Sequence, residues 1–240
     1  MEAESRWSSY PRVFKRFLYS YSMVIVPLYL LMVFSARRLM KLFNPMQLRA
    51  PLILHNVICC ITSVISLYLL TAGLWEGGSL LKLSISTEHL SLGLYIYWLS
   101  KYYELLDTVF MILRHKTRQI SFLHVFHHSS MPFLADYGYH YAPWPPIGFG
   151  LALNSFVHIV MYSYYAMTAC VPLHDFTWKK LITQLQIAQF IIGVVVGLFG
   201  YLNEGYCIFA FLYPLALIGL FSNYYYHAFF KRKLAIKKSS

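Results

Sequence analysis

The chain has 240 residues, of which 58% are apolar and 12% are charged, and its formal net charge is +11. Soluble domains carry about 25% charged residues, so this composition excludes an ordinary soluble domain and favours a chain solvated by lipid. The positive charge does not indicate nucleic-acid binding, because the basic residues stand in short clusters between apolar runs. We therefore expect residues 1–240 to form one membrane domain that binds no nucleic acid.

Apolar runs long enough to cross a hydrocarbon core, about 20 residues each, recur along most of the chain. Seven spans are predicted, with boundaries good to a few residues: 19–35, 54–74, 92–113, 120–134, 147–168, 181–202 and 207–229. The fourth of these is short for a crossing. The sequence therefore predicts an all-α polytopic protein with seven transmembrane helices in the lipid bilayer.

The segments between these spans differ in their content of basic residues. If all seven crossings are real, fourteen Lys and Arg residues fall on one side and five on the other, with Lys101 inside the third span. Lysine and arginine are enriched in the cytosolic loops of membrane proteins. We therefore predict a lumenal N-terminus and a cytosolic C-terminus.

The third span contains one cation and two carboxylates at helical spacing. Lys101, Glu104, Asp107 and Thr108 fit within about 120° of one helix face. Ionisable groups at bilayer depth are costly and usually functional, and opposite charges on one face can compensate each other. The alternative is an ion-pair network that only locks helices together.

The fourth span contains three histidines, His124, His127 and His128, which share a face because they stand at i, i+3 and i+4. Such a cluster is rarely part of an ordinary core. Imidazole is a common metal ligand, and membrane di-iron enzymes also carry HxxHH boxes, but one box undersupplies such a site. The other seven histidines are isolated or stand alone in their spans: His55, His89, His115, His140, His158, His174 and His227. We predict no metal site.

Polar residues also recur on the later spans. The fifth span carries a polar and aromatic stripe about 100° wide, which could equally join helices through hydrogen bonds. The sixth span carries polar residues at three-residue steps, and the seventh carries a weaker set. These residues are Asn154, His158, Met161, Tyr162 and Tyr165, then Thr183, Gln186 and Gln189, then Asn223, Tyr226 and His227.

The depth of these polar groups suggests a shared chamber. A helix rises about 1.5 Å per residue, which places them in one layer of the predicted cytosolic half and leaves the lumenal half nearly free of polar groups. We expect a polar chamber open to the cytosol that continues into an apolar tunnel. The tunnel would suit an acyl chain, and basic loop residues could hold coenzyme A phosphates: Arg114, Lys116, Arg118, Lys179, Lys180 and the cluster from Lys231.

The last four residues, Lys237 to Ser240, read Lys-Lys-Ser-Ser. A cytosolic tail of this kind resembles the dilysine retrieval signal of endoplasmic reticulum membrane proteins, which is an address that a receptor reads. The alternative is a basic tail attracted to anionic lipid. We expect an endoplasmic reticulum membrane protein.

Four ordered motifs resemble the signature boxes of the ELO family of very-long-chain fatty acid elongases. They are Lys101-x-x-Glu104-x-x-Asp107-Thr108, Leu123-His-Val-Phe-His-His128, Asn154-x-x-x-His158-x-x-Met161-Tyr162 and Thr183-x-x-Gln186-x-x-Gln189-Phe190. The resemblance implies seven helices, six of them in a barrel around an acyl tunnel. It implies a 3-oxoacyl-CoA synthase that condenses acyl-CoA with malonyl-CoA, releases CO₂ and CoA, and needs no cofactor. It also implies the other elongation-cycle enzymes as partners and leaves a homo-oligomer open.

The resemblance also implies roles for the clustered residues. His127 is the candidate nucleophile. Its imidazole would attack the thioester and give an acyl-imidazole intermediate. The remaining roles are hypotheses drawn from the residues themselves, and in them Asn154 and His158 would stabilise the enolate formed from malonyl-CoA. The supporting residues would be His124 and His128 for proton traffic, Lys101, Glu104, Asp107 and Thr108 for orientation and charge balance, and Tyr162, Gln186 and Gln189 for substrate binding.

Other readings remain open at this point. A Cys nucleophile is one, although Cys59 and Cys60 lie away from any partner motif in the second span. A receptor or transporter and a metal oxygenase are others. The chain lacks the tryptophan pair that many relatives carry after the histidine box. Val125-Phe126 and Asn154-Ser155-Phe156 resemble the branch that acts on polyunsaturated and very long acyl chains.

Overall fold

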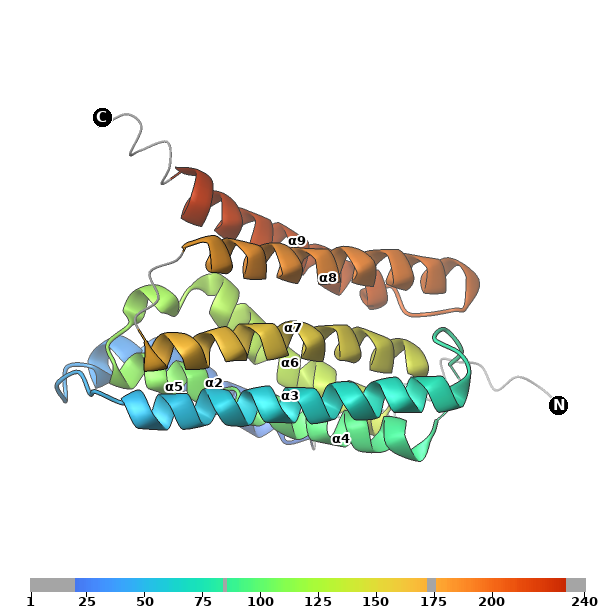
Figure 1. The fold of residues 1–240 in the computed structure, drawn as a ribbon, viewed down its shortest axis with the longest axis horizontal. Helices are drawn as coiled ribbons and strands as arrows, with labels where there is room; N and C mark the ends of the chain where they lie inside the picture. Colours follow the sequence, from blue (N-terminus) through green and yellow to red (C-terminus); the bar gives the residue numbers. More distant parts are fainter. Residues whose placement is uncertain (1–19, 84–85, 172–175, 232–240) are drawn as a thin grey trace.

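The computed structural model describes residues 20–83, 86–171 and 176–231. Every regular element within these ranges is helical, which confirms the predicted all-α class (Figure 1). The elements are α2 (Ser22–Leu39), α3 (Arg49–Gly77), α4 (Glu88–Tyr103), α5 (Leu106–Leu113), η1 (Thr117–Gln119), α6 (Phe122–His140), α7 (Pro145–Cys170), α8 (Phe176–Asn203), α9 (Phe209–Tyr225) and η2 (Tyr226–Lys231).

Four of these helices, α2, α3, α7 and α8, are long and apolar enough to cross a membrane. The predicted span 92–113 is divided into α4 and α5 by a turn at Glu104 and Leu105. Helix α6 has 19 residues, of which five are His or Asp, and this composition lowers its hydropathy. The chain is therefore a multi-pass membrane protein, and its predicted site lies on the less apolar helices α4, α5 and α6 as well as on the apolar helices α7 and α8.

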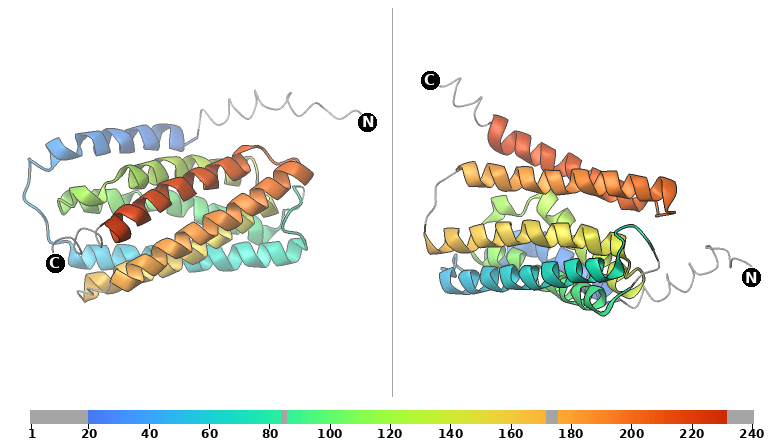
Figure 2. Two further views of the ribbon diagram at one scale, coloured as in Figure 1. Left: turned by 90° about the horizontal axis from the view of Figure 1, so that it is seen from above. Right: turned by 45° about the vertical axis from the view of Figure 1, so that its right-hand side comes forward.

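The helices pack in two groups. Helix α3 packs against α4 and α7, α4 packs against α6, and α2 packs against α6, whereas α8 and α9 form a hairpin that contacts α7 through α8 and α6 through α9. Figures 1 and 2 show this hairpin as a layer beside the other helices. Small residues allow the closest approaches: a Cβ on Gly73 would overlap the backbone of Leu90, and one on Gly197 would overlap the backbone of Ala210.

Two helix starts that bear on the site are capped by hydroxyl side chains. The Ser121 hydroxyl accepts a hydrogen bond from the backbone N–H of His124 at 3.2 Å, and the Thr87 hydroxyl accepts one from Leu90 at 3.2 Å. Caps of this kind satisfy amide groups that the first turn of a helix leaves unpaired. The cap at Ser121 fixes the turn of α6 that carries the histidines.

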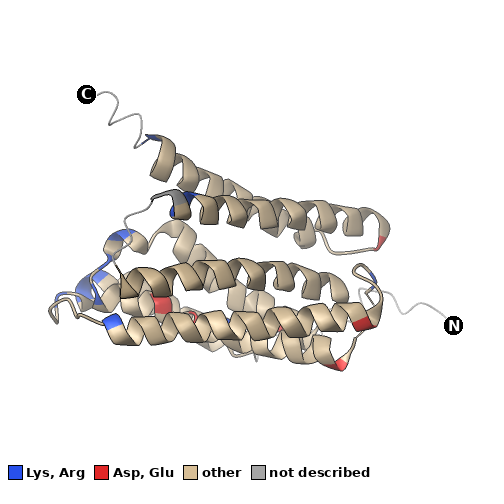
Figure 3. Cartoon of the chain, viewed as in Figure 1, with Lys and Arg blue, Asp and Glu red and all other residues tan. Residues whose placement is uncertain are grey.

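Basic side chains gather at one end of the molecule. Figure 3 shows the described Lys and Arg residues mainly where α3 begins and α7 ends, which we call the basic end. Lys82 follows the other end of α3, which is at Gly77. Arg49 of α3 donates to the carbonyls of Ala169 and Cys170 there and so joins α3 to α7. The predicted dilysine signal and the N-terminal basic residues Arg6 to Arg16 lie outside the described residues.

The half of the bundle away from the basic end is not free of polar groups, so that prediction is wrong. Asp136 of α6 is fully buried there and accepts four hydrogen bonds. The donors are the backbone N–H and hydroxyl of Ser22, the indole of Trp98, and the Tyr102 hydroxyl at 2.8 Å. The prediction failed because every one of these donors lies on another helix, α2 or α4, and sequence spacing reveals only partners on the same helix.

Candidate active site

A lysine and a glutamate form a buried ion pair at the end of α4. The Lys101 ammonium lies 2.6 Å from Oε1 of Glu104, and both residues are only 3% exposed. His158 of α7 completes the group, with Nδ1 3.3 Å from the ammonium and 3.4 Å from the same carboxylate oxygen. A buried charge is tolerated only when it is paired. The predicted compensation of Lys101 by a carboxylate on its own helix face is therefore confirmed.

Asn154 of α7 lies beside this ion pair. Its side-chain oxygen accepts a hydrogen bond from the Tyr97 hydroxyl at 2.8 Å, and the Lys101 ammonium lies 4.3 Å from the centre of the Tyr97 ring. Sequence reasoning missed Tyr97, although its position four residues before Lys101 places both on one helix face. Tyr97 thus links the two polar sets of α4 and α7.

Asp107 at the start of α5 has partners other than Lys101. One of its oxygens accepts a hydrogen bond from the Tyr162 hydroxyl at 2.8 Å, and the other lies 2.9 Å from Nε2 of His55. The interpretation of His55 as isolated is therefore wrong. So is the placement of Cys59 away from any partner motif, because its sulfur lies 3.7 Å from His55 Nε2. His55 escaped notice because its partner lies 52 residues away on another helix.

The three histidines of α6 face this polar group. Nε2 of His124 lies 2.8 Å from the Thr108 hydroxyl oxygen, and the His124 ring lies 4.2 Å from that of His128. The centroid of the His127 ring lies 5.6 Å from that of His128 and 6.4 Å from that of His158. Nδ1 of His127 is buried and has no hydrogen-bond partner among the described residues. The structure thus brings the histidine box together with Thr108 of α5 and His158 of α7, as predicted.

Helix α8 adds amide groups to the rim of this group. Gln186 donates to the sulfur of Met161 on α7 at 3.6 Å. Thr183 and Gln189 are both buried, and the Gln189 carbonyl oxygen has no hydrogen-bond partner in the described part of the chain. Thr183 bonds to a carbonyl of its own helix, that of Lys179. The predicted α8 residues therefore point inward, although only Gln186 contacts another helix through a hydrogen bond.

Several predicted residues lie elsewhere. Asn223 of α9 and Tyr226 and His227 of η2 are exposed, so their assignment to the polar chamber is wrong. Tyr165 is 42% exposed, although its ring centroid lies 6.1 Å from that of Tyr162. The basic candidates lie at the basic end: Arg114 is half-buried, and Lys179 and Lys180 are exposed. Among the described residues, no three His, Cys, Asp or Glu side chains are grouped to hold a metal ion.

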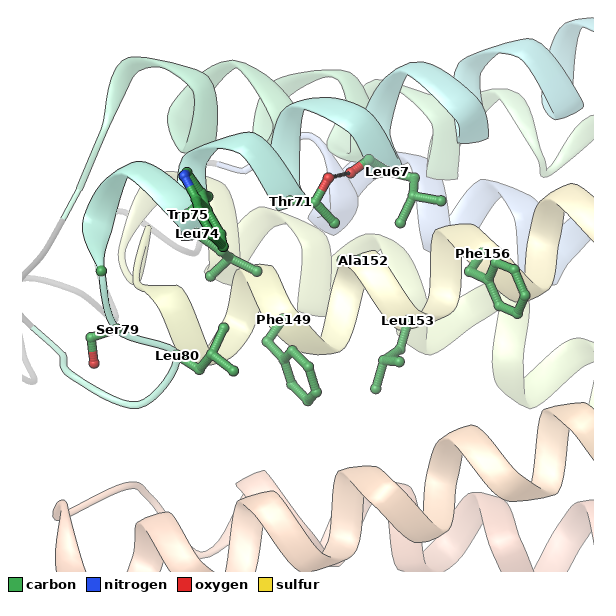
Figure 4. A pocket seen from close by; sticks show the side chains of 11 residues that line it. Leu67, Thr71, Leu74, Trp75, Ser79, Leu80, Phe149, Ala152, Leu153 and Phe156 are labelled. Atoms are coloured by element: carbon green, nitrogen blue, oxygen red, sulfur yellow. Dashed lines mark hydrogen bonds between the residues drawn. The ribbon is translucent and has the colours of Figure 1, made fainter.

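An apolar groove of about 770 Å³ lies on another face of the molecule (Figure 4). It is lined by residues of α3, of α7 and of the turn after α3, and none of the histidines reaches it: Leu67, Thr71, Leu74, Trp75, Gly78, Ser79, Leu80, Phe149, Ala152, Leu153 and Phe156. At 100° per residue, Phe149 and Phe156 lie on the side of α7 opposite Asn154 and His158. The groove is therefore separate from the histidine site.

Comparison with known proteins identifies similar sequences. The ELO family model, described as the GNS1/SUR4 family, matches residues 18–237. Very long chain fatty acid elongase 2 of Rattus norvegicus is 36% identical over 237 residues, which cover 92% of this chain and 82% of that protein. Very long chain fatty acid elongase 5 of Tachysurus fulvidraco is 34% identical over 230 residues, which cover 88% of this chain and 76% of that protein.

Proposed function

Because the chain belongs to the ELO family, we propose that it is an enzyme of very-long-chain fatty acid elongation. Its reaction condenses a long-chain acyl-CoA with malonyl-CoA to give 3-oxoacyl-CoA, CO₂ and CoA. The reaction needs no cofactor, since both carbon–carbon bond formation and decarboxylation can proceed with imidazole and amide groups alone. The relatives' names support this proposal, because they are very long chain fatty acid elongases.

The observation that carries the proposal is the free nitrogen of His127. Its Nδ1 has no hydrogen-bond partner among the described residues, and its ring centroid lies 5.6 Å from that of His128 and 6.4 Å from that of His158. An unpaired ring nitrogen can attack the thioester carbonyl carbon while the carbon–sulfur bond breaks. The acyl group then resides on His127, and the proton lost from the other ring nitrogen goes to the departing CoA thiolate.

The second half of the reaction needs an enolate and groups that stabilise it. Malonyl-CoA loses CO₂, and the carbon of the resulting enolate attacks the acyl carbon as the bond to His127 breaks. One proton then returns to the His127 ring from solvent. Because the Asn154 carbonyl oxygen accepts from Tyr97, its NH₂ group is left to donate to the enolate oxygen. The Lys101 ammonium, which lies 4.3 Å from the centre of the Tyr97 ring, supplies further positive potential near Asn154.

The order of helix contacts supports an acyl tunnel within the bundle. Helices α3, α4, α6, α9, α8 and α7 contact one another in this cyclic order, with α2 outside against α6. We assign the acyl chain to the space between these six helices and the CoA phosphates to the basic end, near Arg114 directly after α5 and near Lys179 and Lys180 at the start of α8. We propose that the basic end faces the cytosol at an endoplasmic reticulum membrane, where the other elongation-cycle enzymes would receive the product.

The proposal is tested with purified protein in lipid nanodiscs. Acyl-CoA and malonyl-CoA together should yield 3-oxoacyl-CoA and one CO₂ for each product, and mass spectrometry after acyl-CoA alone should find the acyl group on His127. Absence of malonyl-dependent CO₂ release would overturn the proposed reaction, and an adduct elsewhere would overturn the role of His127. Comparing saturated with polyunsaturated acyl-CoA in the same assay tests the substrate preference suggested by Val125-Phe126.

A further inference from the structure

We propose that His55 of α3 is a positioning residue of this condensation. Its role would be to hold the Asp107 carboxylate, which in turn orients Tyr162 and the first turn of α5. The inference rests on the proposed function and adds to it a helix that none of the four sequence motifs includes. His55 has no contact with the histidine box itself, so it acts through other residues rather than on the reacting atoms.

The first step of the argument is the bridge that Asp107 makes. Nε2 of His55, whose side chain is only 2% exposed, lies 2.9 Å from one carboxylate oxygen, and the Tyr162 hydroxyl donates to the other at 2.8 Å. Hydrogen bonds to a charged acceptor are stronger than those between neutral groups. With one donor on each oxygen, the carboxylate cannot rotate freely. Asp107 therefore ties α3, α5 and α7 together at one point.

The second step concerns the His55 ring. A carboxylate only accepts hydrogen bonds, so His55 carries its hydrogen on Nε2 and acts as a donor to Asp107. The ring is held by Tyr103, whose centroid lies 4.9 Å away, and by Phe110 at 5.1 Å. Nδ1 of His55 has no hydrogen-bond partner in the described residues. His55 therefore contributes one N–H donor in a fixed direction. The side-chain amide of glutamine can supply a similar donor.

The third step links this bridge to the reacting groups. Helix α5 has eight residues and begins at Leu106, so Asp107 and Thr108 both lie in its first turn. Fixing Asp107 also fixes Thr108, whose hydroxyl lies 2.8 Å from Nε2 of His124. On the other side, the Tyr162 ring lies 5.5 Å from that of His158. Loss of the His55 donor would therefore loosen both Thr108, which contacts His124, and Tyr162, which contacts His158.

The experiment uses the full-length enzyme in nanodiscs with acyl-CoA and malonyl-CoA. His55→Phe keeps an aromatic ring but removes the donor, and we expect kcat to fall about 10- to 100-fold, the range of one hydrogen bond to a charged group. KM for both substrates should change less than about threefold, because the lost interaction acts in the transition state. His55→Gln should keep at least a third of the wild-type kcat. His89→Phe and His89→Gln, at a partly exposed histidine outside the site, should leave kcat unchanged.

The outcomes separate this inference from the proposed function. Wild-type kcat in His55→Phe, or equal losses in His55→Phe and His55→Gln, would overturn the inference alone. An inactive wild type would overturn the proposed function and the inference with it. If His55→Phe does not fold, Tyr162→Phe removes the hydrogen bond to the other oxygen of Asp107. This variant must show the same loss of kcat at unchanged KM. A Tyr162→Phe enzyme with wild-type kcat would also overturn the inference.

Discussion

Two buried carboxylates in the bundle are satisfied in different ways. Glu104 lies near the basic end and pairs with the Lys101 ammonium on its own helix and with His158 of α7. Asp136 lies toward the opposite end and accepts four hydrogen bonds, all from uncharged donors of Ser22, Trp98 and Tyr102. Both side chains are almost completely buried, so burial alone does not distinguish them.

The difference teaches which of the two belongs to the reaction. An ionisable residue inside a membrane protein is by default a candidate for function. Glu104 touches a cation and an imidazole, both of which can exchange protons or follow a developing charge. The hydroxyl, indole and amide donors around Asp136 can do neither at neutral pH. We interpret Glu104 as part of the site and Asp136 as a joint between α2, α4 and α6.

The largest expected effect is that of His127→Ala. We expect condensation to fall at least about 1,000-fold, equivalent to about 4 kcal/mol of barrier, because no other ring replaces the nucleophile. The melting temperature in detergent should stay within about 2 °C, because the removed Nδ1 made no hydrogen bond with the described residues. His140→Ala on the same helix is the control and should remain active. Substantial activity in His127→Ala would show that His127 is not the nucleophile.

Asp136→Leu should have the largest effect on stability. It leaves the donors of Trp98 and Tyr102 buried and unpaired at about 1–3 kcal/mol each, so unfolding in SDS titrations should become easier by about 3 kcal/mol. The activity of the protein that remains folded should stay within about threefold of wild type. A variant that is stable but inactive would instead place Asp136 in the catalytic site. Asp136 and Glu104 would then both belong to the reaction.

A smaller effect is expected from Tyr97→Phe. This change removes the hydrogen bond to Asn154 and lets the amide turn, so kcat should fall about tenfold, or about 1.4 kcal/mol. The comparison variant is Tyr95→Phe, two residues away on α4 and outside the hydrogen-bonded site. Equal kcat values in the two variants would mean that Asn154 is held by something other than Tyr97.

The smallest effect is expected from Tyr102→Phe. Asp136 keeps three of its four donors in this variant, so the stability loss should be about 1 kcal/mol, the net value of one hydrogen bond. Activity should not change. Thermal unfolding of purified protein, measured beside Asp136→Leu, provides the test. A loss as large as that of Asp136→Leu would show that the other donors contribute little.

Sequence reasoning succeeded where partners share a helix. The period of 3.6 residues fixes which side chains share a face, so the pair Lys101 and Glu104 and the trio around His127 could be predicted from their spacing alone. It failed where the partner lies on a different helix, as for His55 with Asp107 and for Asp136 with Trp98, since such contacts depend on how two helices are rotated and offset. The turn between α4 and α5 was missed as well, because no Gly or Pro marks it.

The position of the Asp136 partners along the chain has a consequence for membrane insertion. Inserting a carboxylate at the middle of a helix costs about 2.5–3.5 kcal/mol during translocon-mediated insertion. Both Ser22 and Trp98 precede α6 in the sequence, so their helices are synthesised before Asp136 leaves the ribosome. Newly inserted α6 can thus find its donors already in the bilayer, and α2 and α4 would act as an internal chaperone for the helix that carries the histidine box.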